Sequence, residues 1–264
     1  MEKAKTNLKK YLYLLKVLVF RDIRNQYAGS FLGALWTVLN PLLNMIVMAI
    51  VFINIFGSSS ITLDYPVYVL AGNIIFNLFR SGSEGALTSV VDQRDLLSKT
   101  KVPLYIIPMS RVGSSIVSFL FSYVALIIVM LIRIPAGVTF HWSMLLALIL
   151  LPSLILFTLG FSFLLSSFFV SFRDIKHFYS VILTLWMYLT PLFYSIESLN
   201  LSPLMNNILK INPMFHFVLY FRETLMGITN DWQTLLLCYS WGIAIFGIGY
   251  LVFDVRKNKL LLEA

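Results

Sequence analysis

Residues 112–132 read VGSSIVSFLFSYVALIIVMLI and contain no charged side chain. An apolar α-helix of ~20 residues is long enough to cross the ~30 Å hydrocarbon core of a bilayer. The rest of the chain has the same character, because 59% of its 264 residues are hydrophobic and only 12% are charged. Soluble domains usually carry about 25% charged residues. The composition therefore predicts an integral membrane protein rather than a soluble domain with a large core.

Similar runs recur on both sides of this segment, and we expect an all-α, polytopic protein with six transmembrane helices. The predicted spans are 33–56, 65–90, 112–132, 143–169, 178–194 and 232–253. Short connections between most of them favour one membrane domain over residues 1–264, with the bundle at 33–253 and a tail at 254–264. We see no cleavable signal peptide, because a basic segment of about 30 residues precedes the first apolar run.

The basic residues indicate the orientation of this bundle. With the N-terminus inside, the inner segments are 1–32, 91–111, 170–177 and 254–264. They hold sixteen of the 20 Lys and Arg residues, whereas the outer segments hold three, Arg133, Lys210 and Arg222. Because Lys and Arg accumulate on the cytoplasmic side of membrane proteins, both termini are predicted to be cytoplasmic.

Three regions outside the spans are predicted to form further structure. Residues 1–29 repeat apolar side chains at spacings of three and four between basic ones, which is typical of an amphipathic helix in the cytoplasmic interface. The highly charged loop 92–103 allows a short helix before its proline, or a plain solvated loop. Residues 195–231 are long for a connector, and prolines at 203 and 213 favour two short re-entrant helices in the outer leaflet, or a helical cap.

The chain offers few residues for catalysis. Cys238 is the only cysteine, so an internal disulfide and a cysteine metal cluster are excluded. A phosphate-binding loop of the G-x-x-x-x-G-K-[ST] type is absent, and the three histidines form no metal-binding motif. Asp92 and Asp95 make a D-x-x-D pair, but Arg94 lies between them and no second acidic motif completes a two-metal site. We predict no catalytic, cofactor or metal residues in this chain.

Two intramembrane charges and several deep aromatics are candidates for a polar pathway. Arg80 and Glu84 are four residues apart, so they share one helix face and can pair. An ionisable group at mid-membrane costs ~2.5–3.5 kcal/mol and normally faces a bundle interior or a wet path, although the pair could also neutralise itself near the interface. The candidate pathway residues are Trp36, Phe76, Phe79, Arg80, Glu84, Trp186 and Tyr188. For any single aromatic, core packing or lipid contact remains the alternative.

Four groups of motifs resemble one known family over nearly the whole chain. They are FRDIRNQYAGSFLGALW at 20–36 followed by Asn40-Pro41, the basic run 97–108 with Val102-Pro103 and Ile107-Pro108, FRDI at 172–175, and the outer set Thr190-Pro191, Asn212-Pro213 and Phe221-Arg222. In their order and spacing, these motifs resemble the membrane subunit of ABC-2 type polysaccharide exporters, the permeases for O-antigen, teichoic acid and capsule.

The resemblance implies a homodimer in the bacterial inner membrane, bound to two copies of a separate P-loop ATPase that carries ATP and Mg²⁺. It also implies a lipid-linked glycan substrate of the undecaprenyl diphosphate type and no nucleic acid partner. Candidate coupling residues toward the ATPase are Asp92, Arg94, Asp95, Lys99, Lys101, Arg173 and Asp174. Arg21 and Arg24 are candidates for the diphosphate at the cytoplasmic entrance, on charge position alone. The outer gate candidates are Pro191, Asn212, Pro213 and Arg222.

Two other functions stay open on the sequence. An ABC-2 exporter of lipids or drugs would share the architecture, although the high aromatic content favours a glycan. A membrane enzyme acting on lipid-linked substrates would need an acidic metal site, for which only Asp92 and Asp95 are available. A chain without a nucleotide site cannot drive transport by hydrolysis alone, which independently favours a separate motor subunit.

Overall fold

The computed structural model describes residues 2–26, 29–36, 39–40, 42–44, 46–47, 64–99, 102–194, 203–228 and 232–263. Its helices are α1 (Glu2–Gln26), η1 (Gly33–Leu35), α3 (Tyr65–Leu87), α4 (Ser89–Asp92), α5 (Arg94–Lys99), α6 (Ile106–Ile132), η2 (Ile134–Ala136), η3 (Trp142–Leu146), α7 (Ala147–Phe169), α8 (Ile175–Leu189), α9 (Pro203–Ile211), α10 (Pro213–Met226) and α11 (Trp232–Glu263). No strand occurs in these ranges, so the predicted all-α class is confirmed for them.

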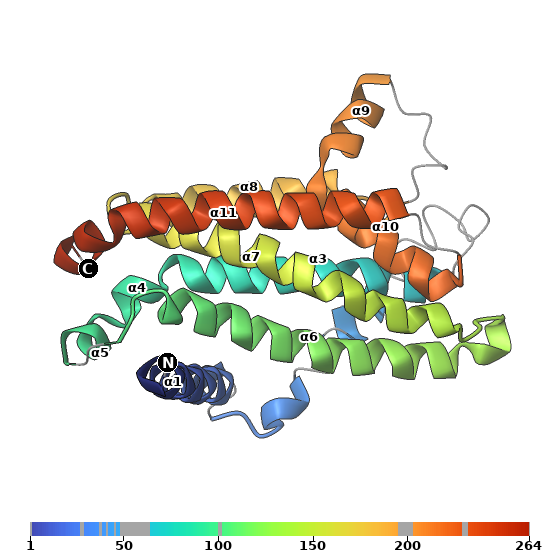
Figure 1. The fold of residues 1–264 in the computed structure, drawn as a ribbon. Coiled ribbons are helices and arrows are strands. Elements are labelled where there is room, and N and C mark those ends of the chain that lie inside the picture. The colour runs from blue at the N-terminus through green and yellow to red at the C-terminus, as the bar shows by residue number, and fades with distance from the viewer. Residues whose placement is uncertain are drawn as a thin grey trace.

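The long helices lie side by side in one elongated bundle, while α1 runs across it beside α6 (Figure 1). Helix α3 lies between α6 and α7, and α11 packs along α7. The core consists mainly of aromatic and branched side chains, with Phe76, Phe79, Phe157, Phe217 and Phe221 among the largest that are fully buried. This arrangement buries most of α3, which positions the few α3 side chains that stay exposed.

Three helices of the described ranges, Ile106–Ile132, Trp142–Phe169 and Trp232–Leu260, are long and apolar enough to cross a membrane. They coincide with the third, fourth and sixth predicted spans. The second prediction coincides with α3, and the fifth with α8, whose 15 residues rise only ~22 Å at ~1.5 Å per residue. Most of the first predicted span, 33–56, lies outside the described residues, so six spans in total stay a prediction.

The segments that were predicted to face inward gather at one end of the bundle (Figure 1). Helices α4 and α5, the turn between α7 and α8, and the C-terminal end of α11 all lie there. The α6–α7 connection and the end of α10 lie at the other end. The basic connecting segments and the other connecting segments therefore lie at opposite ends of the bundle, as the orientation prediction requires. Which end faces the cytoplasm stays a prediction.

At the opposite end from α4 and α5, an ion pair joins the start of α3 to the end of α6. Arg133 donates from Nε to both carboxylate oxygens of Asp64 at 3.1 Å and from Nη2 to Oδ2 at 2.6 Å. The hydrogen bond and the charge of Asp64 raise the pKa of Arg133. This bidentate pair fixes the α3–α6 register where the two helices meet the connecting segments.

The two short helices predicted after the fifth span are α9 and α10, and each begins with its expected proline, Pro203 or Pro213. Asn212 caps α10, because its side chain accepts a hydrogen bond from the Met214 amide at 3.0 Å. Gly227, with φ +73°, ends the helix in the left-handed conformation. The helices are thus confirmed, and their depth in a membrane stays a prediction.

Candidate functional site

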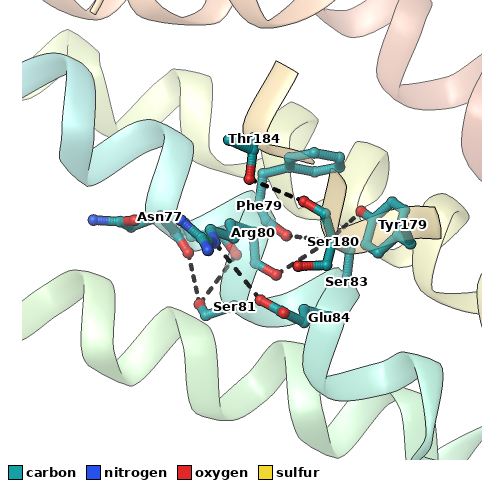
Figure 2. A network of polar contacts seen from close by, with 10 residues as sticks. Asn77, Phe79, Arg80, Ser81, Ser83, Glu84, Tyr179, Ser180 and Thr184 are labelled. Carbon is teal, nitrogen blue, oxygen red and sulfur yellow. Dashed lines mark hydrogen bonds and ion pairs between the residues drawn. The ribbon is translucent and has the colours of Figure 1, made fainter. Parts of the chain in front are cut away.

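One side of α3 exposes polar side chains although most of the helix is buried. Asn77, Ser81 and Glu84 are exposed and Arg80 is half-buried, and their spacing of three and four residues puts them on one helix face. The Arg80 Nε atom lies 3.6 Å from Glu84 Oε2, and Figure 2 shows the two side chains beside each other. We call these four residues the α3 polar face.

A cavity of about 310 Å³ opens along this face toward α6. Besides the α3 polar face, the polar residues that line it are Gln26, Asn40, Ser115, Ser118 and Ser122. Trp36 is also part of the lining, and its indole nitrogen donates to the Ser30 hydroxyl at 3.0 Å. An open cavity lined by hydroxyl, amide and charged groups with one indole ring can hydrogen-bond and stack against a polar ring compound.

The other flank of the α3 polar face is α8, which exposes Ser180 and Thr184 (Figure 2). Tyr188 is exposed on the same helix. Tyr179 of α8 points the opposite way and donates to the Ser83 hydroxyl at 2.6 Å, which ties α8 to α3 inside the core. Burial raises the cost of leaving such hydroxyls unpaired, so this bond helps fix the spacing of the two helices. The exposed α8 residues extend the polar surface from α3 toward the end of the bundle that holds α10.

The predicted pathway residues fall into two groups. Trp36, Arg80 and Glu84 meet at the cavity, and Tyr188 is exposed on α8. The other three, Phe76, Phe79 and Trp186, belong to the hydrophobic core of the chain or pack against it. Phe79 is 0% exposed, and its ring centroid lies 5.0 Å from that of Trp186. For these three aromatics the contacts favour the packing alternative, and a pathway role stays a prediction.

The candidate coupling residues lie at one end of the bundle. Asp92, Arg94, Asp95 and Lys99 are exposed on or next to α4 and α5, while Lys101 lies outside the described residues. Arg173 and Asp174 are exposed in the turn between α7 and α8, at the same end (Figure 1). A partner that docks at this end would meet both segments, although a coupling role for them stays a prediction.

The two arginines predicted to attract a diphosphate differ in their surroundings. Arg24 is exposed, whereas Arg21 contacts the Asp22 carboxylate at 3.1 Å. Asp22 also lies 3.4 Å from Arg111 of α6, which ties the end of α1 to the bundle. Asp22 and Arg111 were not among the predicted site residues, because nothing in their local sequence patterns shows that α1 crosses α6. Arg21 therefore has a structural partner, which leaves Arg24 as the freer of the two cations.

The four outer candidates meet at the end of α8. Arg222 is 5% exposed and donates to the Pro191 carbonyl at 2.7 Å. Asn212, directly before Pro213, donates to the Thr190 hydroxyl at 3.1 Å. The guanidinium carbon of Arg222 also lies 3.4 Å from the ring centroid of Tyr68 in α3, a residue that was not among the predicted site residues. No spacing rule links positions 68 and 222, so only the fold reveals this contact.

Comparison with known proteins agrees with these motifs. The model of the ABC-2 type transporter family matches residues 13–226. The O-antigen export system permease protein RfbA of Myxococcus xanthus is 31% identical over 257 residues, which cover 96% of this chain and 95% of that protein. The protein of the same name from Klebsiella pneumoniae is 28% identical, covering 97% of each chain. The polysialic acid transport protein KpsM of Escherichia coli is 23% identical, covering 94% of this chain and 95% of that protein. The chain therefore belongs to the ABC-2 type transporter family.

Proposed function

We propose that this chain is the permease subunit of an ATP-driven exporter that moves a lipid-linked polysaccharide, such as O-antigen or teichoic acid, out of the cytoplasm. Relatives that cover nearly the whole chain are named for O-antigen export and for polysialic acid transport. The observation that carries the proposal is the α3 polar face, which exposes an ion pair on a helix that coincides with the second predicted span. Exposed ionisable groups at membrane depth are costly against lipid, so this face belongs beside water, cargo or another protein chain.

The neighbours of the α3 polar face support a path between two copies of the chain. The helix α8 exposes apolar side chains next to its polar ones, including Phe178, Val181 and Leu185. A second copy could cover the apolar side chains and leave the polar ones along a shared channel. We therefore propose a homodimer of six-span subunits, with both termini in the cytoplasm and the polar faces toward the path.

The energy source must come from elsewhere, since the chain lacks a phosphate-binding loop. We propose that two copies of a P-loop ATPase, which bind ATP and Mg²⁺, dock against α4, α5 and the turn that holds Arg173 and Asp174. Docking can drive transport only if the motor contacts the closed and open permease differently. An undecaprenyl diphosphate carrier would approach the same end of the bundle, where Arg24 is exposed.

The proposal is tested by replacing Arg80 in vesicles that hold the permease and its ATPase, with ATP-dependent movement of a labelled lipid-linked glycan as the readout. Arg80→Leu should insert and bind the ATPase normally but export more slowly, because Arg80 contributes charge to the path rather than to the core. Lys257→Leu is a matched control, since Lys257 and Asp254 form another exposed pair within one helix, at 2.8 Å. Wild-type export by the Arg80→Leu permease would refute the pathway role.

The enzyme alternative is separated from the permease by replacing Asp92 and Asp95 together with asparagine. An enzyme that uses the two carboxylates for a metal would lose all turnover while its other binding interactions stay unchanged. A permease should instead lose assembly or coupling with the ATPase. Movement or modification of the glycan by the purified chain, without any partner, would overturn the proposed function itself.

A further inference from the structure

The segment that follows α8 is a helix break whose backbone needs outside partners. Helix α8 ends at Leu189, and Thr190 has an extended conformation with φ −93° and ψ 127°, as favoured before a proline. A break of this kind releases carbonyl groups from helical hydrogen bonds. Buried carbonyls without a donor cost free energy, and lipid supplies no donor. The Thr190 carbonyl accepts from the Leu192 amide at 2.6 Å, so the carbonyls that need side chains of other helices are those of residues 191–194.

Arg222 of α10 satisfies two of these carbonyls. Its Nη1 donates to the Pro191 carbonyl at 2.7 Å and its Nη2 to the Leu192 carbonyl at 2.9 Å. The same guanidinium donates to the Tyr68 carbonyl of α3 from Nε at 3.2 Å and from Nη2 at 3.0 Å. A planar group with five donors can serve three carbonyls from two segments at once, whereas a lysine ammonium lacks this fork.

Two tyrosines of α3 satisfy the next carbonyls. The Tyr65 hydroxyl donates to the Phe193 carbonyl at 2.9 Å, and the Tyr68 hydroxyl donates to the Tyr194 carbonyl at 2.8 Å. Four consecutive carbonyls, at positions 191–194, thus accept hydrogen bonds from α3 or α10. A segment that only connects two helices does not require a side-chain hydrogen bond to each of its carbonyls. These four hydrogen bonds therefore hold residues 191–194 in one place against α3 and α10.

Asn212 joins the start of α10 to the end of α8 from the other side. Its Nδ2 donates to the Thr190 hydroxyl at 3.1 Å, and its Oδ1 accepts from the Trp186 indole at 2.7 Å. The same oxygen caps α10 through the Met214 amide. The side chain is therefore committed on both of its polar atoms.

We infer that Tyr65, Tyr68, Asn212 and Arg222 form a clamp that locks the adjoining ends of α3, α8 and α10 into one rigid unit. The four are positioning residues, since they act on the helix break. If a path opens along α3 and α8, this unit must move as one body, and any bending of the helices must occur at other positions. What the movement serves rests on the proposed function, whereas the clamp itself can be tested without any cargo.

The test is hydrogen–deuterium exchange of the peptide 186–194 in the full chain held in nanodiscs. Arg222→Lys keeps the charge but loses the fork. Gly72→Ala removes no polar group, but its Cβ would lie 2.6 Å from Arg222 Nη2 and displace the guanidinium. Gly85→Ala is the matched control on α3, because its nearest contact would be an ordinary 3.7 Å to Arg111 Cβ. We expect exchange at least ~10-fold faster in both variants, a loss of ~1.4 kcal/mol, and no change in the control.

Wild-type exchange in a folded Gly72→Ala chain would overturn the clamp, even if Arg222→Lys fails to fold. A second measurement addresses rigidity, in which the same peptide is followed during ATP turnover by the assembled exporter. Protection should stay constant, and a rise would overturn the rigid unit by making the break itself the hinge. Wild-type export by a Gly72→Ala permease with faster exchange would overturn the positioning role. Absence of glycan export by the wild-type assembly would count against the proposed function only.

Discussion

Replacing Gly160 with alanine should force two packed helices apart. Gly160 of α7 faces α11, and an added Cβ would lie against the Ile245 carbonyl and 2.6 Å from the Phe246 amide nitrogen. Both contacts are to backbone, so no side chain can rotate away. Since carbon atoms pack best at ~3.5–4.0 Å, relief requires a separation of about 1 Å between the two helices. Close approach at small residues is the usual way in which membrane helices pack.

The expected loss in the free energy of unfolding follows from overpacking at this backbone contact. Overpacking of a fitted interface typically costs ~1–3 kcal/mol, and each kcal/mol lowers the melting temperature by ~2–4 °C for a domain of ~150–250 residues. We therefore expect Gly160→Ala to melt ~2–12 °C below the wild type. The assay is loss of the monodisperse peak in size-exclusion chromatography after heating the detergent-purified chain.

The matched control is Gly247→Ala on α11, where an added Cβ would meet nothing within 4 Å. This variant should melt at or above the wild type, because alanine is favoured over glycine in a helix by ~1 kcal/mol. Identical melting temperatures for the Gly160 and Gly247 variants would refute the reasoning, since they would show that α7 and α11 do not meet backbone to backbone.

Two further variants test contacts within the chain. Asp22→Asn should weaken the attachment of α1 by ~1–3 kcal/mol, because it leaves Arg21 and Arg111 without their shared carboxylate. The measurement is the rate at which trypsin releases α1, which should rise. A wild-type rate of cleavage would contradict this prediction. Tyr179→Phe should cost ~1 kcal/mol, because it removes the 2.6 Å bond to the Ser83 hydroxyl. It should lower the melting temperature by a few degrees and leave export unchanged, so lost export at an unchanged melting temperature would contradict a purely structural role.

The helices were the part of the fold that the sequence predicted best. Helices α6, α7 and α11 are confirmed as long apolar helices. They could be predicted because a long uncharged run is typical of a membrane-spanning helix, and its length alone indicates one. The starts of α9 and α10 could be predicted from Pro203 and Pro213, since proline fits the first turn of a helix and not its interior. Both signals are local, which is why neither depends on how the helices later pack.

The environment of each candidate side chain could not be predicted in the same way. Phe79 and Trp186 were pathway candidates, yet their rings pack together inside the helix bundle. An apolar helix is hydrophobic on every face, so its sequence does not indicate which aromatic side chains face the core and which face lipid. Arg111 and Tyr68 were missed for a related reason. Their partners come from helices that are distant in the sequence, and only the packing brings them together.

The two arginines of the predicted sites show how burial separates function from stability. Arg80 is 38% exposed beside Glu84 at 3.6 Å, so water screens the pair and its contribution to folding is on the order of 0.5 kcal/mol. Arg222 is buried and its donors serve three backbone carbonyls, which would lose their partners if the guanidinium were removed. Loss of Arg80 should therefore slow export in a normally folded chain, whereas loss of Arg222 should first disturb the fold around the helix break. Replacing an arginine should therefore impair export first at position 80 and folding first at position 222. The Arg80 charge faces a cavity, whereas the Arg222 guanidinium supplies hydrogen-bond donors to backbone carbonyls.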